Sequence, residues 1–248
     1  MPSAVTKSFN VLRLLRRSPT AVSVSEVARS VRIAPSTAHA ILGELQAQGA
    51  VTQDADKRYR LGPATYYLGA AFARSAPISR GIWNELTEVA RELAVTAAIA
   101  IPWENHHLIL NVHQHSDGEL EVALGGRVPI DAGSWGKAYY AWSPAEPGAP
   151  TRFTSSSVTD PGEYRSQVER TRELGYATDH EEFTRGVGAV AAGVTSERGF
   201  EGVASLMAPI SRMDEVGFDA AGRRLAWVAS RASFALGDLR RMKVVGIA

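Results

Sequence analysis

Residues 20–61 carry the signals for two short helices and a hairpin in immediate succession. Ser23 and Glu26 have the spacing of a capping box, in which each side chain accepts a hydrogen bond from the other residue's backbone amide, so a helix should begin there. A short turn at residues 31–33 leads to a second helix that begins at Pro35, where no amide hydrogen is needed. Gly49 is expected to end that helix. This order predicts a helix-turn-helix followed by a β-hairpin.

The hairpin consists of two predicted strands, residues 50–53 and 57–61, around a polar tip. Its second strand carries three cations that are placed to contact DNA phosphates: Lys57, Arg58 and Arg60. The second helix begins with short polar side chains that are placed to contact base edges: Ser36, Thr37 and His39. We therefore predict a winged helix-turn-helix that binds DNA, although either half alone would also fit a plain helical hairpin or a solvated basic surface.

The distribution of charge agrees with DNA binding. The whole chain has a formal net charge of +1, but residues 1–62 contain nine basic and four acidic side chains, whereas the remainder contains 18 and 22. Because phosphate neutralisation supplies much of the affinity for DNA, only the basic part is expected to bind it. We predict a DNA-binding domain at residues 1–62, a linker helix at 63–80 and a second domain at 81–248.

Composition excludes several classes of protein. The chain has no cysteine, so it has no disulfides, thiolate metal sites or cysteine nucleophiles. The predicted helix at residues 8–17 is interrupted by arginines and does not resemble a secretion signal, and no apolar stretch is long enough to span a bilayer. We therefore expect a cytoplasmic protein with no membrane partner and no cofactor.

The linker segment is apolar on more than one side, with Tyr66, Tyr67, Leu68 and Phe72 within one predicted helix. Ala76-Pro77 should break it, and a second helix is expected from Ser79 or Arg80. We expect the first helix to pack against the same helix of a second copy, because a two-fold dimer presents two recognition helices to half-sites one DNA turn apart. The alternative is an ordinary core helix within one chain.

Strand and helix patterns do not alternate strictly in the second domain, which favours an antiparallel sheet flanked by helices, an α+β fold. Residues 144–159, rich in Pro, Ser and Thr, are expected to form a mobile surface loop. The predicted strands are 96–101, 108–115, 119–124, 187–195 and 201–209, and the predicted helices are 136–142, 163–174 and 219–236.

Several stretches in this order resemble the IclR family of bacterial transcriptional regulators, over about residues 7–236. The resemblance implies a winged helix-turn-helix joined by a helix to a GAF-like effector domain, assembled as a dimer or a dimer of dimers, that represses or activates catabolic genes in response to a small metabolite. The stretches are Ser36-Thr37-Ala38-His39, residues 58–63, Gly126-Arg127-Val128-Pro129, Gly136-Lys137-Ala138 and residues 175–183 with Gly186-Val187.

The resemblance also implies a position for the effector pocket, between a helix start and neighbouring strands. The residues that match these family positions are Ser134, Trp135 and Gly136 at the helix start and Asp179, Val187, Ala189, Ser205 and Met207 on the strands. We expect a ligand carboxylate to bind the Trp135 and Gly136 amides. Ala40 stands where the family commonly has arginine, which leaves the operator sequence open.

Aromatic residues crowd this predicted pocket, and Trp103 and His113 lie on nearby predicted strands. Flat aromatic walls would stack on an aromatic ligand, so we predict that the effector is a small aromatic acid or its derivative. The alternative is that these aromatic side chains only fill the core.

Two patterns raise the question of catalysis or metal binding. Ser134 and Lys137 have the S-x-x-K spacing of a serine acyl-transfer site, but the supporting K-T-G element is absent. Four histidines lie close in the sequence, at 106, 107, 113 and 115, but without cysteine a metal site would need carboxylates from elsewhere. We predict neither an enzyme nor a metal site; the alternative function is a small-molecule hydrolase or binding protein with an N-terminal tether.

Overall fold

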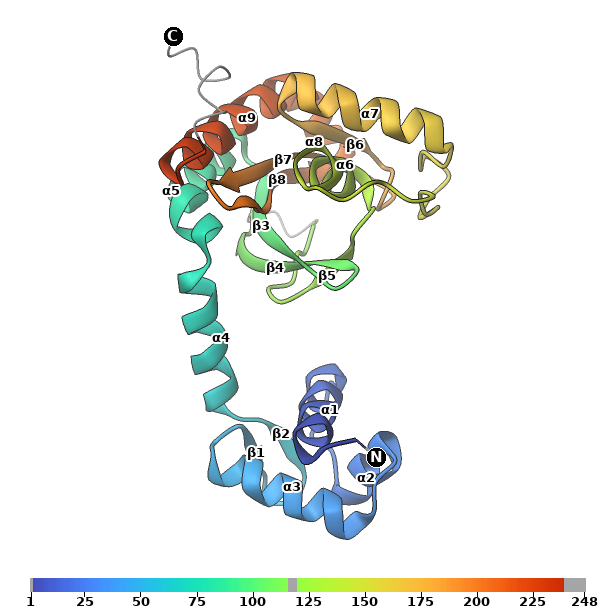
Figure 1. Ribbon diagram of the computed structural model, residues 1–248, viewed down its shortest axis with the longest axis vertical. Helices are drawn as coiled ribbons and strands as arrows, with labels where there is room; N and C mark the ends of the chain where they lie inside the picture. Colours follow the sequence, from blue (N-terminus) through green and yellow to red (C-terminus); the bar gives the residue numbers. More distant parts are fainter. Residues whose placement is uncertain (1, 116–119, 239–248) are drawn as a thin grey trace. The chain divides into compact units, whose positions relative to one another are not determined.

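The computed structural model describes residues 2–115 and 120–238 (Figure 1). The chain divides into two compact units between Arg74 and Ser75. Within the described residues, no helix combines the length and apolar character needed to cross a bilayer.

The first unit is a winged helix-turn-helix, as predicted. Ser23 caps its second helix with both hydrogen bonds of the capping box formed, and Arg32 takes a left-handed φ of 58° that turns the chain toward the third. Pro35 occupies the first turn of that third helix, and Gly49 follows it with a φ of 68°. The elements are α1 (Ala4–Arg17), α2 (Val24–Val31), α3 (Pro35–Ala47), β1 (Val51–Gln53), β2 (Tyr59–Leu61) and α4 (Pro63–Ser75), which begins in this unit.

The wing is anchored in the core of this unit. Val11, Val27 and Leu42, one from each of the first three helices, are fully buried in one cluster with Tyr59 of the wing. Tyr59 also exchanges two backbone hydrogen bonds of 2.8 Å with Val22, on the side of β2 that β1 does not occupy. The base of the hairpin is therefore held in place by core packing and backbone hydrogen bonds at Tyr59.

The second unit is built on one antiparallel sheet of six strands, in the order β5-β4-β3-β8-β7-β6 (Figure 1). Its α+β character is as predicted. The strands are β3 (Thr96–Trp103), β4 (His106–His113), β5 (Arg127–Pro129), β6 (Ala177–His180), β7 (Val187–Ser196) and β8 (Gly199–Pro209).

Helices cover both faces of this sheet. On one face, α5 (Pro77–Leu93), α8 (Ile210–Val216) and α9 (Phe218–Ala235) enclose a core that includes Ile82, Leu206 and Leu225. On the other face, α6 (Gly133–Trp142) packs Trp135 and Ala138 against the strands. Helix α7 (Pro161–Leu174) then covers α6. Both faces of the central strands are thus buried.

Small residues in the central strands allow the helices to lie close to the sheet. A Cβ atom at Gly193 would lie 2.5 Å from the Trp142 ring, and one at Gly188 would lie 2.8 Å from atoms of both Met213 and Phe218. These two positions of β7 therefore require glycine, because the helices on each side leave no room for a side chain.

Some predicted boundaries need correction. Of the predicted strand 119–124, Glu119 lies outside the described residues and 120–124 form no strand, because Gln114 hydrogen-bonds the Leu120 carbonyl and the Val122 amide in place of a strand ladder. The strand that pairs with the outer side of β4 is β5 instead. Helix α5 begins at Pro77 rather than at Ser79 or Arg80, and α6 begins three residues before Gly136. Strand β4 ends at His113, and α8 was not predicted.

Candidate functional site

Helix α3 exposes polar side chains at its start. Ser36 and His39 are exposed and Thr37 is half-buried, whereas Ala38 and Leu42 are fully buried on the inner side of the helix. Ala34 at the N-cap makes no side-chain capping bond, so the first-turn amides receive no acceptor from it. Such a helix end attracts negative charge, and the arrangement suits contact with a DNA backbone and its base edges.

The tip of the wing is held by one carboxylate. The Asp54 side chain accepts hydrogen bonds from the Asp56 and Arg58 amides at 3.1 and 2.9 Å, and Lys57 takes a left-handed φ of 59°. Lys57 and Arg60 are exposed. Both side chains are therefore accessible to another molecule.

Arg58 differs from the other two wing cations. Its Nη2 atom donates to Glu26 Oε2 at 2.9 Å and its Nε atom donates to the Ala21 carbonyl at 2.8 Å. The same Glu26 carboxylate accepts from the Ser23 amide, and this hydrogen bond is the main reason that the pKa of Glu26 is lowered. Arg58 thus ties the wing to the start of α2, a contact that its position in the sequence did not indicate.

Most of the predicted effector residues meet where α6 covers the sheet. Trp135, Ala189 and Met207 are buried in one cluster, and Val187 packs against it. Strand register places Ser205 opposite Ala98 and Ala191, which belong to the same cluster. These residues are far apart in the sequence, and only the family resemblance predicted that they lie at one site. We call this packed cluster, together with its flanking polar residues, the α6 pocket, because it lies where the resemblance implies the effector site.

Asp179 forms one polar end of the α6 pocket. It pairs with Ala189 in the sheet, and its carboxylate lies so close to the helix start that a Cβ at Gly133 would be 1.8 Å from Oδ2. Its Oδ1 atom accepts from the Glu182 amide at 2.6 Å. Burial, followed by the neighbouring charge of Glu182, raises the pKa of Asp179 to about 6. This is a carboxyl group that titrates close to neutral pH.

The predicted binding of a ligand carboxylate by the Trp135 and Gly136 amides needs a correction. The Gly136 amide already donates to the Ala132 carbonyl at 2.9 Å, so of the two predicted amides only that of Trp135 belongs to the first turn, where amides have no acceptor within the helix. Gly136 has a steric role instead, since a Cβ there would lie 2.4 Å from the Asp131 backbone. The Asp179 carboxylate also occupies part of the space near the helix start.

Two predicted residues do not join the pocket. Trp103 is 42% exposed, and the guanidinium carbon of Arg127 lies 5.3 Å from its ring centre. His113 follows Val112, which faces the α6 pocket, so it points to the opposite face of the sheet. There burial first, and then the charge of Arg91 on α5, lower its pKa.

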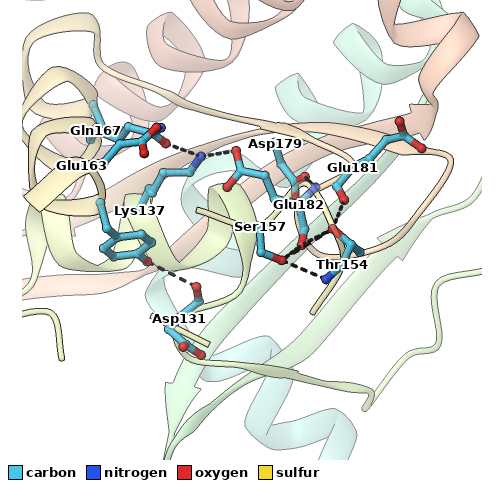
Figure 2. Close-up of polar contacts among 11 residues, drawn as sticks. Asp131, Lys137, Thr154, Ser157, Glu163, Gln167, Asp179, Glu181 and Glu182 are labelled. Carbon is cyan, nitrogen blue, oxygen red and sulfur yellow. Dashed lines mark hydrogen bonds and ion pairs between the residues drawn. The ribbon is translucent and has the colours of Figure 1, made fainter. Parts of the chain in front are cut away.

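The serine and lysine of the S-x-x-K pattern are not paired. Lys137 Nζ donates to Glu182 Oε1 at 2.7 Å and to Gln167 Oε1 at 3.0 Å (Figure 2), whereas the buried Ser134 Oγ has no hydrogen-bond partner within the described part of the chain. Among the residues that the structure describes, no group of three or more His, Asp or Glu side chains is arranged to hold a metal ion.

The loop between α6 and α7 is fixed beside the Lys137 ion pair. Thr154 and Ser157 donate to the carbonyls of residues 181 and 182 at 2.7 and 2.6 Å (Figure 2). The Lys137 side chain is only 2% exposed and that of Glu182 11%. Because removing either partner would leave a buried charge unpaired, this pair constrains the chain next to Asp179. Nothing in the local sequence indicated Glu182 as its partner.

His107 is a buried residue of the α6 pocket that the sequence analysis considered only as a metal ligand. Its ring packs edge-on against Trp135 and Tyr139, with centroid distances of 5.7 and 5.8 Å. Burial lowers its pKa to about 4, so the ring is neutral at pH 7.

A separate surface cavity of about 580 Å³ lies between α7, β6 and the start of α9. The Lys137 and Glu182 pair contributes to its wall, but Trp135 and Met207 do not line it. Its wall also includes Tyr176, whose hydroxyl donates to Asp219 at 2.8 Å. This cavity is distinct from the α6 pocket.

The raised pKa of Asp179 gives a test of the site. A carboxyl whose pKa is higher in the folded chain contributes less stability as the pH rises, here between about 4 and 6. Asp179→Asn keeps the acceptor for the Glu182 amide and removes the buried charge, so its unfolding free energy should exceed that of the wild type by about 1–3 kcal/mol at pH 7.5 and match it near pH 4.

Urea unfolding across this pH range measures the difference. Asp214→Asn, at an exposed position of α8, is the matched control and should change the unfolding free energy by less than about 0.5 kcal/mol. An Asp179→Asn protein that is less stable than the wild type at pH 7.5 would show that the ionised carboxylate is required by the fold.

Comparison with known proteins matches both units. Residues 4–55 match the IclR helix-turn-helix domain, and residues 70–234 match the family described as bacterial transcriptional regulator IclR C-terminal. The HTH-type transcriptional regulator Rv1719 of Mycobacterium tuberculosis is 31% identical over 242 residues, which cover 91% of this chain and 89% of that protein. The glycerol operon regulatory protein of Streptomyces griseus is 28% identical, covering 85% and 86%.

Solved structures share the fold. An IclR regulator from Alicyclobacillus acidocaldarius has a TM-score of 0.79 at 23% identity, covering 99% of this chain and all of that one. An IclR homologue from Microbacterium hydrocarbonoxydans, crystallised with 4-hydroxybenzoate, has a TM-score of 0.81 at 21% identity, covering 94% and 99%. With its two units matched in order by both family domains, the chain belongs to the IclR family of bacterial transcriptional regulators and, like its relatives in that family, is not an enzyme.

Proposed function

We propose that this DNA-binding regulator controls catabolic genes and that its effector is a small aromatic carboxylic acid or a derivative of one. The observation that carries the proposal is the composition of the α6 pocket, which contains the apolar side chains of Trp135 and Met207 and the buried polar side chains of Asp179 and Ser134. Pockets that are mostly apolar with a few placed polar groups suit small organic ligands.

The aromatic part of the proposal has two supports. Three rings lie edge to face around the pocket, since His107 contacts both Trp135 and Tyr139, and such rings favour a flat aromatic ligand. The Microbacterium structure of the same fold contains 4-hydroxybenzoate. The relatives named as glycerol operon regulators support control of catabolic genes.

The DNA-binding part assigns separate roles to helix α3 and the wing. We assign base contacts to Ser36, Thr37 and His39, because the first turn of a recognition helix lies nearest the base edges. Lys57 and Arg60 are assigned to phosphates, whereas two of the guanidinium donors of Arg58 are already used by Glu26 and the Ala21 carbonyl.

Assembly is assigned to helix α4. None of its residues is buried, although Tyr66, Tyr67 and Leu68 are apolar and 78%, 72% and 67% exposed. Burying such side chains contributes about 25 cal/mol per Å² of apolar surface, so α4 gains by packing against a second copy. Effector binding would then favour one packing of the dimer and change the spacing of the recognition helices, to the extent that the ligand binds the two arrangements unequally.

The roles of wing and helix predict different defects. Lys57→Ala and Arg60→Ala should weaken binding to all DNA sequences alike and lower the slope of log affinity against log salt by about 0.9 per lost phosphate contact. His39→Ala should change the preference among sequences. Fluorescence anisotropy with the chain's own upstream promoter and a scrambled duplex measures both effects.

Arg185→Ala is the control for loss of a positive charge, since Arg185 is exposed in the second unit. Equal losses of affinity from Arg185→Ala and Lys57→Ala would contradict the assignment to phosphates.

Replacing the exposed apolar residues of α4 tests the assembly. The double variant Tyr66→Ser, Leu68→Ser should shift the chain toward monomers, because it removes apolar surface that only a partner covers. Analytical ultracentrifugation measures the mass. Leu124→Ser changes a residue of the second unit that is also 67% exposed and should leave the mass unchanged; a double variant with the wild-type mass would rule out α4 as a principal contact.

Ligand titration tests the effector class. Benzoate and 4-hydroxybenzoate should quench the fluorescence of Trp135 and change promoter binding, whereas butyrate at the same concentration should do neither. Trp135→Phe should remove the quenching, and Trp227→Phe, at a residue 45% exposed on α9, should retain it. A response to butyrate without a response to either aromatic acid would refute the proposed class.

A further inference from the structure

Two fully buried polar atoms beside Trp135 have no hydrogen-bond partner among the residues that the structure describes. They are Nδ1 of His107 and Oγ of Ser134, and both residues are 0% exposed. His107 packs against the Trp135 ring from strand β4, and Ser134 precedes Trp135 on α6. Folded proteins satisfy nearly all buried polar atoms, so two unsatisfied atoms at one aromatic side chain indicate a partner that binds there.

The chemistry of the His107 atom is fixed by its other nitrogen. Nε2 lies 3.2 Å from the Ile130 carbonyl oxygen, and a carbonyl can only accept, so Nε2 carries the hydrogen. The lowered pKa of about 4 keeps the ring neutral at pH 7. Nδ1 therefore presents a lone pair and can only accept a hydrogen bond.

An acceptor of this kind selects among ligand groups. A carboxylate has no hydrogen to donate at pH 7, so it cannot satisfy Nδ1, whereas a hydroxyl group can. The Ser134 hydroxyl can donate a hydrogen bond, and it lies in the first turn of α6 together with the Trp135 amide. The start of α6 therefore suits a carboxylate. Trp135 and Tyr139 flank the His107 ring edge-on, and the matching ligand is a flat ring with a hydroxyl and a carboxylate.

We propose that His107 is a specificity-determining residue of the α6 pocket, whose Nδ1 atom accepts a hydrogen bond from a hydroxyl group on the effector. The effector is then a hydroxylated aromatic acid, with Ser134 donating to its carboxylate. This inference rests on the proposed function, because it takes the α6 pocket as the effector site.

The variant His107→Gln isolates the Nδ1 atom. The glutamine amide can still donate to the Ile130 carbonyl, but it places no lone pair at the Nδ1 position. We expect the wild type to bind at least one of 2-, 3- and 4-hydroxybenzoate about 3- to 10-fold more tightly than benzoate, the effect of one hydrogen bond. In His107→Gln this preference should vanish while affinity for benzoate stays within about twofold. Isothermal titration calorimetry with the full chain measures all four acids.

Two further measurements keep the result interpretable. His180→Gln, at an exposed position of β6, is the matched control and should leave the affinities for all four acids unchanged. In wild-type protein with 15N-labelled histidine, the Nδ1 resonance of His107 should move upfield on addition of the preferred hydroxybenzoate and remain in place with benzoate. This readout does not depend on the stability of any variant.

The outcomes separate the two proposals. Equal binding of benzoate and the hydroxybenzoates by the wild type, or a preference that survives in His107→Gln, overturns the role of His107 and leaves the aromatic-acid effector intact; an ordered water would then be the partner of Nδ1. Failure of all four acids to bind overturns the aromatic-acid effector and this inference together.

Discussion

The start of helix α6 is the constraint on which the second unit depends. The helix lies between the sheet and α7, and it can do so only because two of its first four residues lack side chains. Gly133 leaves room for the Asp179 carboxylate, and Gly136 leaves room for the Asp131 backbone. The buried Lys137 and Glu182 pair then fixes the segment that carries Asp179. The polar groups beside Trp135 are therefore held in fixed positions, and preorganised groups of this kind lose little entropy when a ligand binds.

The same close packing explains why the strands are rich in alanine and glycine. Both faces of β7 are covered by helices, and large side chains there would push the helices away, as Trp142 against Gly193 illustrates. At two positions of β7 the large side chains come from the helices, Trp142 of α6 at Gly193 and Met213 and Phe218 of α8 and α9 at Gly188. Around Trp135 the bulky side chains are therefore few, among them Met207 of β8 and His107 of β4.

The sequence predicts elements whose signals are local and misses features that depend on tertiary contacts. The capping box at Ser23 and the proline at position 35 placed the first unit's helices correctly, because those residues act on their own backbone. The partner of Arg58 lies 32 residues away, and nothing nearby announces it. His113 was predicted to be an effector residue from its place on a nearby strand, but a bulge opposite Ile99 and Ala100 adds one residue to β4 and turns His113 to the other face of the sheet. The buried Nδ1 of His107 is likewise visible only once its neighbours are in place.

The Arg58 and Glu26 bridge has a consequence for how this protein responds to its ionic surroundings. The Glu26 carboxylate offsets the positive charge of Arg58, so the net charge of the wing and its base is smaller than the number of arginines and lysines suggests. Both partners are about two-fifths exposed, so dissolved salt screens their attraction as well. A higher salt concentration should therefore weaken DNA binding and, at the same time, weaken the ion pair that holds the wing to α2.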